Sequence, residues 1–274
     1  MQVLEITMNH RSIVCLVALC LFVSLRLSGD EKPPTVLFLI GEQEYHTSET
    51  LPQFARIHLE PKGIRCVYAT AGELDPNRFD GLEALPQADL LVVSVRRRTP
   101  SVEQMDLIKT HISQGKPLIG IRTASHAFDR APPDNHHVRW AEFDREILGM
   151  DYENHYGNKP PEDPPTKIWI EKSVEDHPLL QGVEAQFEST SHLYKNRRPD
   201  PKTVILILGQ VVGREEIEPV AWTYKSKSCP VFYTSLGTPD DFKNRSFVQL
   251  LSNAVFHMLK NEQESSRTNQ SQPK

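Results

Sequence analysis

Short apolar segments alternate with helix-like segments in the first half of the chain, and this alternation restricts the folds open to it. Thr35 to Ile40 (TVLFLI) is apolar after its first residue, as expected of a strand buried on both faces of a sheet. Three further segments have the same strand-like character: Arg65–Thr70, Ala88–Val95 and Pro117–Ile121. Helices are predicted between them, at Leu51–Leu59 and from the capping-box residue Ser101 to Gly115. Strand, helix, strand at this spacing predicts a parallel sheet with right-handed crossovers.

The second half of the chain changes to a succession of strand-like segments. Four strands are expected there: Lys167–Glu171, Thr203–Val212, Pro219–Tyr224 and Pro230–Ser235. An amphipathic helix from Ser246 to Leu259 follows them, because Phe247, Leu250 and Leu251 fall on one side of it. We therefore expect an α/β fold in which a mostly parallel sheet has helices on both faces and continues into an antiparallel C-terminal part.

The first 30 residues have the pattern of a signal peptide. Arg11 precedes an uncharged apolar run from Ile13 to Leu25. This run is shorter than the roughly 20 residues that a helix needs to cross a bilayer. We expect an exported protein, periplasmic or secreted, without stable membrane insertion after signal removal; an uncleaved N-terminal anchor is the alternative.

A single domain is expected at residues 31–262. Its strand and helix pattern is interrupted at residues 129–165, which are rich in Pro, His and Asp and which we interpret as an insertion with one helix around Val138–Leu148. Residues 263–274 have the composition of a disordered tail.

Charge and cysteine content narrow the choice of partner. The formal net charge of −5 argues against nucleic acid or an anionic membrane as a partner, and a homo-oligomer is left open.

Cys66 and Cys229 each lie in a strand-like segment, where we expect two buried thiols. A disulfide between them is the alternative in an exported protein.

Ionisable side chains follow several of the predicted strands. Ligands of open parallel sheets bind beyond the carboxyl ends of the strands. Gly41–Glu49 follows the first strand and carries Tyr45 and His46, and Arg96–Arg98 follows the third. Arg122 and His126 follow the fourth strand, and Gly237–Asp241 follows the last. We expect these loops to meet at one edge of the sheet.

Arg122 lies where a strand-to-helix turn in many α/β enzymes presents a Ser or Cys nucleophile. An arginine there cannot attack a carbonyl, but its guanidinium can hold a carboxylate or stabilise an oxyanion. The alternative is an arginine paired with a neighbouring acid to fix the loop. His46 and His126 are candidate proton shuttles near neutral pH, or else structural groups.

Arg96 and Arg98 are candidate anion ligands, because alternation along an extended chain turns Arg97 the other way. Solvated charges are the alternative. Histidines and aspartates crowd residues 126–155, but no two have the H-x-x-x-H spacing of a helical zinc site, so no metal is assigned. A metal-dependent hydrolase remains a third reading. No glycine-rich phosphate loop is present, and no cofactor is predicted.

Several motifs of the chain, taken in order, resemble those of the ThuA-like family of trehalose utilisation. GEQEYHTSETLP, GKPLIGIRTASHAFD, EDHPLLQGV, PVAWTY and PVFYTSLG carry the resemblance, which spans roughly Thr35 to Leu259. It implies a flavodoxin-like fold similar to that of class I glutamine amidotransferases, and a role in sugar metabolism. The amidotransferase nucleophile is absent because Arg122 occupies its turn, so glutamine hydrolysis is not expected.

The resemblance also implies sugar contacts. His192 and Tyr194 fall where the family places a segment over the pocket, so Tyr194 is expected to stack on a pyranose ring and His192 to hydrogen-bond to hydroxyls. Tyr45 and Asp240 complete the predicted substrate contacts. The resemblance implies a histidine where this chain has Thr238, and this departure favours a non-catalytic role.

Two functions are consistent with these features. In the first, the chain acts on a sugar or keto-sugar, with His126 or His46 as acid or base and Arg122 next to a developing enolate oxygen. In the second, it is a non-catalytic carbohydrate-binding or partner-docking domain. Catalysis through histidine predicts turnover that changes near pH 6–7, whereas pure binding predicts no turnover.

Overall fold

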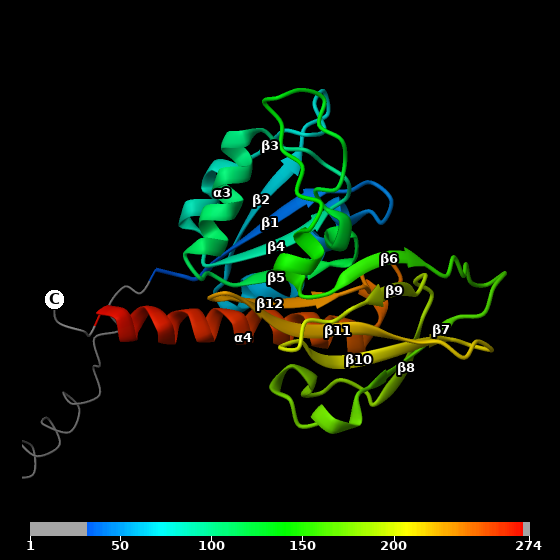
Figure 1. Ribbon diagram of the computed structural model, residues 1–274. Coiled ribbons are helices and arrows are strands. Elements are labelled where there is room, and N and C mark those ends of the chain that lie inside the picture. Colours follow the sequence, from blue (N-terminus) through cyan, green and yellow to red (C-terminus); the bar gives the residue numbers. More distant parts are fainter. Residues whose placement is uncertain (1–31, 271–274) are drawn as a thin grey trace, which may run out of the picture. The chain divides into compact units, whose positions relative to one another are not determined.

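A ten-stranded sheet forms the centre of the computed structural model, which describes residues 32–270 (Figure 1). The predicted signal peptide and the last residues of the predicted tail lie outside the described residues. Five strands are mutually parallel neighbours, in the order β2 (Arg65–Ala71), β1 (Thr35–Gly41), β4 (Leu90–Val95), β5 (Leu118–Ile121) and β12 (Cys229–Thr234). The predicted parallel sheet is confirmed.

Beyond β12 the sheet becomes antiparallel, as expected for the C-terminal part. The added strands are, in spatial order, β11 (Ile217–Ser226), β10 (Val204–Val211), β7 (Thr166–Ile170) and β8 (Gln186–Ser189). The short strand β3 (Phe79–Asp80) closes the other edge. A separate two-stranded sheet pairs β6 (Asp151–His155) with β9 (Tyr194–Arg197).

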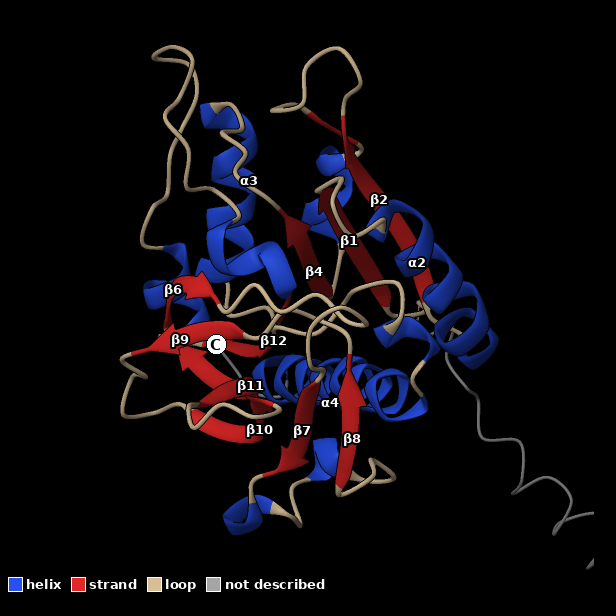
Figure 2. Cartoon of the chain, turned by 90° about the vertical axis from the view of Figure 1, so that its right-hand side faces the viewer, coloured by secondary structure: helices blue, strands red, loops and turns tan. Residues whose placement is uncertain are grey.

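Helices cover both faces of the sheet. α3 (Val102–Ser113) lies on one face and begins at Ser101, whose hydroxyl accepts a 3.3 Å hydrogen bond from the backbone N–H of Gln104. α2 (Thr47–Phe54) and α4 (Arg245–Gln270) lie on the opposite face (Figures 1 and 2). None of the described helices is long and apolar enough to cross a membrane.

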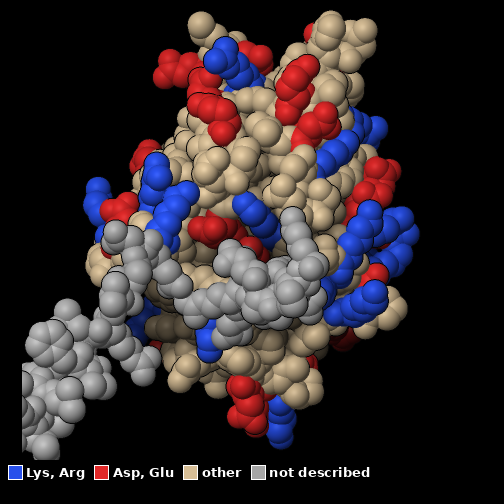
Figure 3. Space-filling model, turned by 90° about the vertical axis from the view of Figure 1, so that its left-hand side faces the viewer, with Lys and Arg blue, Asp and Glu red and all other residues tan. Residues whose placement is uncertain are grey.

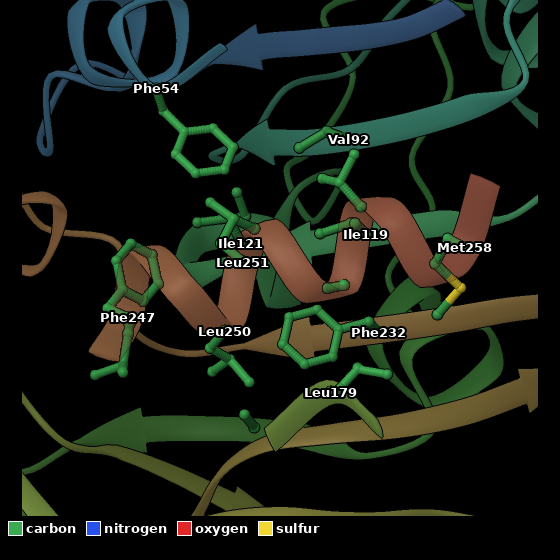
Figure 4. Close-up of a cluster of buried hydrophobic side chains, with 14 of the residues drawn as sticks. Phe54, Val92, Ile119, Ile121, Leu179, Phe232, Phe247, Leu250, Leu251 and Met258 are labelled. Atoms are coloured by element: carbon green, nitrogen blue, oxygen red, sulfur yellow. The ribbon is translucent and has the colours of Figure 1, made fainter. Parts of the chain in front are cut away.

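Two hydrophobic cores follow from the alternation of side chains along the strands. In β1, Val36, Phe38 and Ile40 pack on the α2 and α4 side, and Leu37 and Leu39 pack on the α3 side. This explains why the strand is apolar at nearly every position. Figure 4 shows the first core, in which the apolar side of α4 lies against the side chains of β5 and β12.

The segment between residues 129 and 165 differs from its predicted content. The helix expected at Val138–Leu148 is reduced to one π-helical turn at Asp144–Leu148, and β6 follows it. Asp144 hydrogen-bonds nearby backbone N–H groups where the helix was expected: it accepts from the N–H groups of Arg145 and Tyr152, each at 2.8 Å. At the other end of the chain, α4 continues past Leu259 to Gln270.

Both cysteines of the domain are free thiols. Cys66 lies in β2 and Cys229 in β12, with three strands of the sheet between them. Burial raises the pKa of each thiol to about 12, so neither is a nucleophile at neutral pH. The open alternative of a disulfide is therefore not realised.

The side of the molecule away from that in Figure 2 carries basic and acidic side chains intermixed (Figure 3).

Candidate functional site

The loops that carry the predicted site residues leave neighbouring strands at one edge of the sheet. β1 lies between β2 and β4, so the order of the strands changes direction there, which is where ligands of such sheets bind. Figure 2 views the molecule from this side. The chain after β4 is tied to the turn after β5, because the N–H of Arg97 donates to the carbonyl of His126 at 3.0 Å.

Arg122 lies at the centre of this edge, directly after β5, and is 1% exposed. Its guanidinium stacks on the rings of Tyr45 and Tyr194, with Cζ 4.2 and 4.7 Å from their centroids. Nη1 donates to the carbonyl of Ser235 at 2.7 Å, but Nε and Nη2 are buried without a hydrogen-bond partner. A buried donor without an acceptor costs about 1–3 kcal/mol, which a ligand oxygen would recover.

The backbone of Arg122 is held in the left-handed region, with φ at 44°. Its carbonyl accepts hydrogen bonds from the hydroxyls of Tyr233 at 2.7 Å and Ser125 at 3.2 Å, which fix the turn. Gly120 lets the Tyr233 ring lie against the turn, because a Cβ at residue 120 would lie 2.9 Å from that ring. A strained non-glycine residue that its surroundings hold in place is typical of functional sites.

The loop after β1 brings Tyr45, not His46, to the guanidinium. The buried carboxylate of Glu42 accepts hydrogen bonds from the N–H groups of Tyr45 at 2.7 Å and Thr47 at 2.8 Å, and so fixes the loop and the start of α2. His46 has φ at 53°, and its side chain is 63% exposed, with Nδ1 3.7 Å from the carboxylate of Glu49. The structure therefore separates His46 from Arg122.

His126 belongs to the same cluster as Arg122. Its ring stacks on Tyr152 at 4.5 Å and lies 6.1 Å from the ring of Tyr194. Burial, together with the charges of Arg97, Arg96 and Arg122, lowers the pKa of His126 to about 3. The imidazole is therefore neutral at neutral pH.

His192 and Tyr194 lie over the cluster from the chain leading into β9 and from β9 itself. The ring of His155, from β6, lies 5.2 Å from His192 and 6.4 Å from Tyr194. Burial and then the charge of Arg122 lower the pKa values of both histidines. Tyr152 and His155 were not predicted as site residues, because their strand β6 has no apolar pattern; the only signal was the aromatic and histidine content of that segment.

The remaining predicted residues divide into two groups. Arg96 and Arg98 line a hollow of about 400 Å³ beside Glu42 and Glu44. Asp240 does not point into the cluster: its side chain is 56% exposed and pairs with Lys243 at 2.7 Å. Among the residues described, no group of three His, Cys, Asp or Glu side chains is arranged to hold a metal ion.

Asp241, next to Asp240, fixes the loop after β12. Its buried carboxylate accepts from the backbone N–H groups of Gly237 at 2.8 Å and Thr238 at 2.9 Å. It also accepts from the hydroxyls of Ser189 at 2.6 Å and Ser191 at 2.5 Å. These bonds join the loop beside Arg122 to the connection that carries His192, so Asp241 holds two walls of the site together.

Two buried histidines make the fold sensitive to acid. Burial lowers the pKa of His111 from 6.5 to about 4 and contributes most to the low pKa of His126, about 3. Both are neutral in the folded chain and take up a proton on unfolding at any pH between these values and 6.5. Their contribution to stability is therefore fully present above pH 6.5 and is lost as the pH falls toward 4.

We expect His111→Gln to reduce the fall of the free energy of unfolding with decreasing pH by about 1 kcal/mol per pH unit between roughly pH 4.5 and pH 6. Glutamine does not titrate, and its amide can replace the 3.1 Å contact of Nε2 with the carbonyl of Pro117. Asp144, whose pKa burial raises to about 6, acts with the opposite sign, so the variant is compared with the unchanged chain. Urea unfolding measures the slopes, with His46→Gln as the exposed control; equal slopes for His111→Gln and the unchanged chain would contradict the assignment.

A family model described as ThuA, trehalose utilisation, matches residues 35–258. A ThuA-like protein from Parabacteroides merdae is similar, with a TM-score of 0.60 at 15% identity over 83% of this chain and 90% of that one. A glutamine amidotransferase from Thermotoga maritima has a TM-score of 0.50 at 10% identity over 83% of this chain and 98% of that one.

A carbohydrate deacetylase named Agd3 has a TM-score of 0.54 at 10% identity, over 80% of this chain but 32% of that one. No curated protein matches the sequence. At these identities the solved structures show a shared fold, which is the amidotransferase-like, flavodoxin-type fold implied by the motifs.

Proposed function

Because this chain belongs to the ThuA family of trehalose utilisation, we propose that it binds and transforms a sugar or keto-sugar at the carboxyl edge of its sheet. The family match confirms the resemblance found in the motifs, and it places the chain in carbohydrate utilisation. The substrate and the chemistry are the proposal.

The observation that supports this proposal most strongly is the state of Arg122. It is a buried cation in a strained backbone conformation, and two of its nitrogens, Nε and Nη2, have no acceptor. The rings of Tyr45 and Tyr194 cover it in the structure. A sugar oxygen reaches the donors when Tyr45 moves aside, and the sugar ring then lies among the aromatic side chains.

The proposed reaction uses two groups of the cluster. A keto-sugar gives the proton beside its carbonyl to the neutral imidazole of His126, and the electron pair moves onto the carbonyl oxygen. Arg122 stabilises the negative charge that develops there. His46 is not needed for this step, because its side chain is exposed and paired with Glu49.

The non-catalytic alternative is favoured by one observation. Burial and neighbouring arginines lower the pKa of His126 to about 3, which makes it a weak base. In this second function the cluster binds a carbohydrate and leaves it unchanged.

A panel of glucose, trehalose, keto-sugars and sugar acids separates the two functions. Ligand-observed NMR reports binding, and product analysis on the same samples reports turnover. The first function predicts both binding and turnover. The change of rate near pH 6–7 expected from the sequence is corrected: because the pKa of His126 is about 3, its ionisation does not change the rate between about pH 6 and 8. Binding without turnover would support the alternative, and no binding by any member would overturn both.

Export is also proposed, from the pattern of residues 1–30. The mature domain is expected to be free of nucleic acid and of stable membrane insertion, with a small-molecule carbohydrate as its partner. Fractionation of cells that produce the full chain tests this, and retention of all the protein in the cytosol would contradict it.

A further inference from the structure

Arginine side chains are concentrated at the same edge as the site. Arg96, Arg97 and Arg98 follow β4 and Arg122 follows β5. Arg130 lies close enough to Arg98 that, after burial, its charge is the next cause that lowers the pKa of Arg98. This edge is rich in positive charge although the whole chain has a formal net charge of −5.

The acidic residues of the edge already have partners. Both oxygens of Glu42 accept backbone N–H groups of the loop after β1. Glu44 pairs with Arg96 at 2.9 Å. Within the described residues no carboxylate lies within ion-pair distance of Arg98, and its Nε is buried without a hydrogen-bond partner. The Nε of Arg98 is therefore a charged donor without an acceptor.

A hollow gives a ligand access to these arginines. It has a volume of about 400 Å³ and is lined by Glu42, Gln43, Glu44, Arg96 and Arg98. This volume falls in the range of about 300–1,000 Å³ that small-molecule sites occupy. The N–H of Arg98 donates to the carbonyl of Ala127 at 2.7 Å, so the hollow adjoins the turn that carries Arg122 and His126.

We propose that the ligand is an ionised sugar, whose carboxylate or phosphate group binds Arg98 and Arg96 in this hollow while its ring lies at the Arg122 cluster. The inference deepens the proposed function and depends on it. The forked donors of a guanidinium match the oxygens of both anionic groups. A bound anion lowers the electrostatic repulsion among the neighbouring arginines. A neutral sugar leaves this repulsion unchanged.

Isothermal titration of the full chain at about 150 mM salt tests the inference with three probes. These are glucose, glucuronate and glucose 6-phosphate, which share a ring and differ in charge. We expect at least one charged probe to bind at least tenfold more tightly than glucose. The probe that does so identifies the anionic group. Equal affinities for all three would overturn the inference while leaving a neutral-sugar function intact.

Two variants locate the anionic group. Arg98→Gln is expected to weaken binding of the charged probe at least tenfold more than it weakens binding of glucose. Arg98→Lys keeps the charge but lacks the forked donors, so its affinity for the charged probe is expected to lie between those of the unchanged chain and of Arg98→Gln. Arg65→Gln removes an equal charge at the start of β2, at the opposite edge of the sheet, and serves as the control.

Thermal unfolding confirms that each variant is folded before titration. The inference is contradicted if Arg65→Gln and Arg98→Gln weaken binding equally, since the effect would then be general charge. If Arg122→Met abolishes binding of glucose and charged probes alike while Arg98→Gln changes neither, the proposed function stands and the inference fails.

Discussion

Replacing Arg122 with methionine is expected to weaken sugar binding by at least a hundredfold. Methionine is long and apolar, so it fills the space between Tyr45 and Tyr194 but offers no hydrogen-bond donor. A charge-assisted hydrogen bond to a ligand contributes about 1.5–3 kcal/mol, and Nε and Nη2 of Arg122 are each free to form one, so their loss together exceeds a hundredfold. Titration with the tightest-binding sugar of the panel measures the loss.

The same variant has a smaller effect on folding, and this must be measured separately. The carbonyl of Ser235 loses its 2.7 Å hydrogen bond, which costs about 1–3 kcal/mol of stability. Arg122→Lys retains the charge and is expected to recover part of the affinity. Arg65→Met, at the opposite edge of the sheet, is the matched control. If the folded Arg122→Met chain bound sugar as tightly as the unchanged chain, Arg122 would have a structural role alone.

Asp241→Ala is expected to destabilise the fold by about 3–5 kcal/mol. It leaves the N–H groups of Gly237 and Thr238 and the hydroxyls of Ser189 and Ser191 without their acceptor. The loop beside Arg122 is then free of the β9 connection, so sugar binding weakens as well. Urea unfolding at neutral pH measures the stability.

Asp240→Ala is the matched control for this effect. Asp240 is the neighbouring acid, and its exposed ion pair with Lys243 is of the kind that contributes little to stability. We expect its substitution to change stability by less than about 1 kcal/mol. Similar losses for the two substitutions would show that the buried hydrogen bonds of Asp241 do not hold the site together.

The sheet could be predicted because its strands are buried on both faces. β1, β4 and β5 are continuous apolar segments, and such segments separated by helices have few other arrangements. β6 and β9 could not be predicted, because they are short and polar and pair with each other outside the main sheet. The helix expected at Val138–Leu148 is reduced to one turn for a different reason: the carboxylate of Asp144 accepts the backbone N–H groups of Arg145 and Tyr152.

The site could be predicted as far as strand order determines it. Arg122 and His126 follow β5 and lie together because the turn is short. Whether Tyr45 or His46 faces Arg122 depends on the backbone of His46, which is left-handed with φ at 53°. The pattern of side chains in the sequence does not reveal this conformation. The charge state of His126 also escaped prediction, because it depends on burial and on arginines from another loop.

A crystal structure of the chain soaked with the tightest-binding sugar tests the central claim, that Arg122 and the aromatic side chains around it form the ligand site. We expect the Tyr45 ring to have moved and a sugar oxygen to lie about 2.7–3.2 Å from Nε or Nη2 of Arg122. A sugar bound elsewhere, with Tyr45 and Tyr194 still closed over the guanidinium, would contradict the claim.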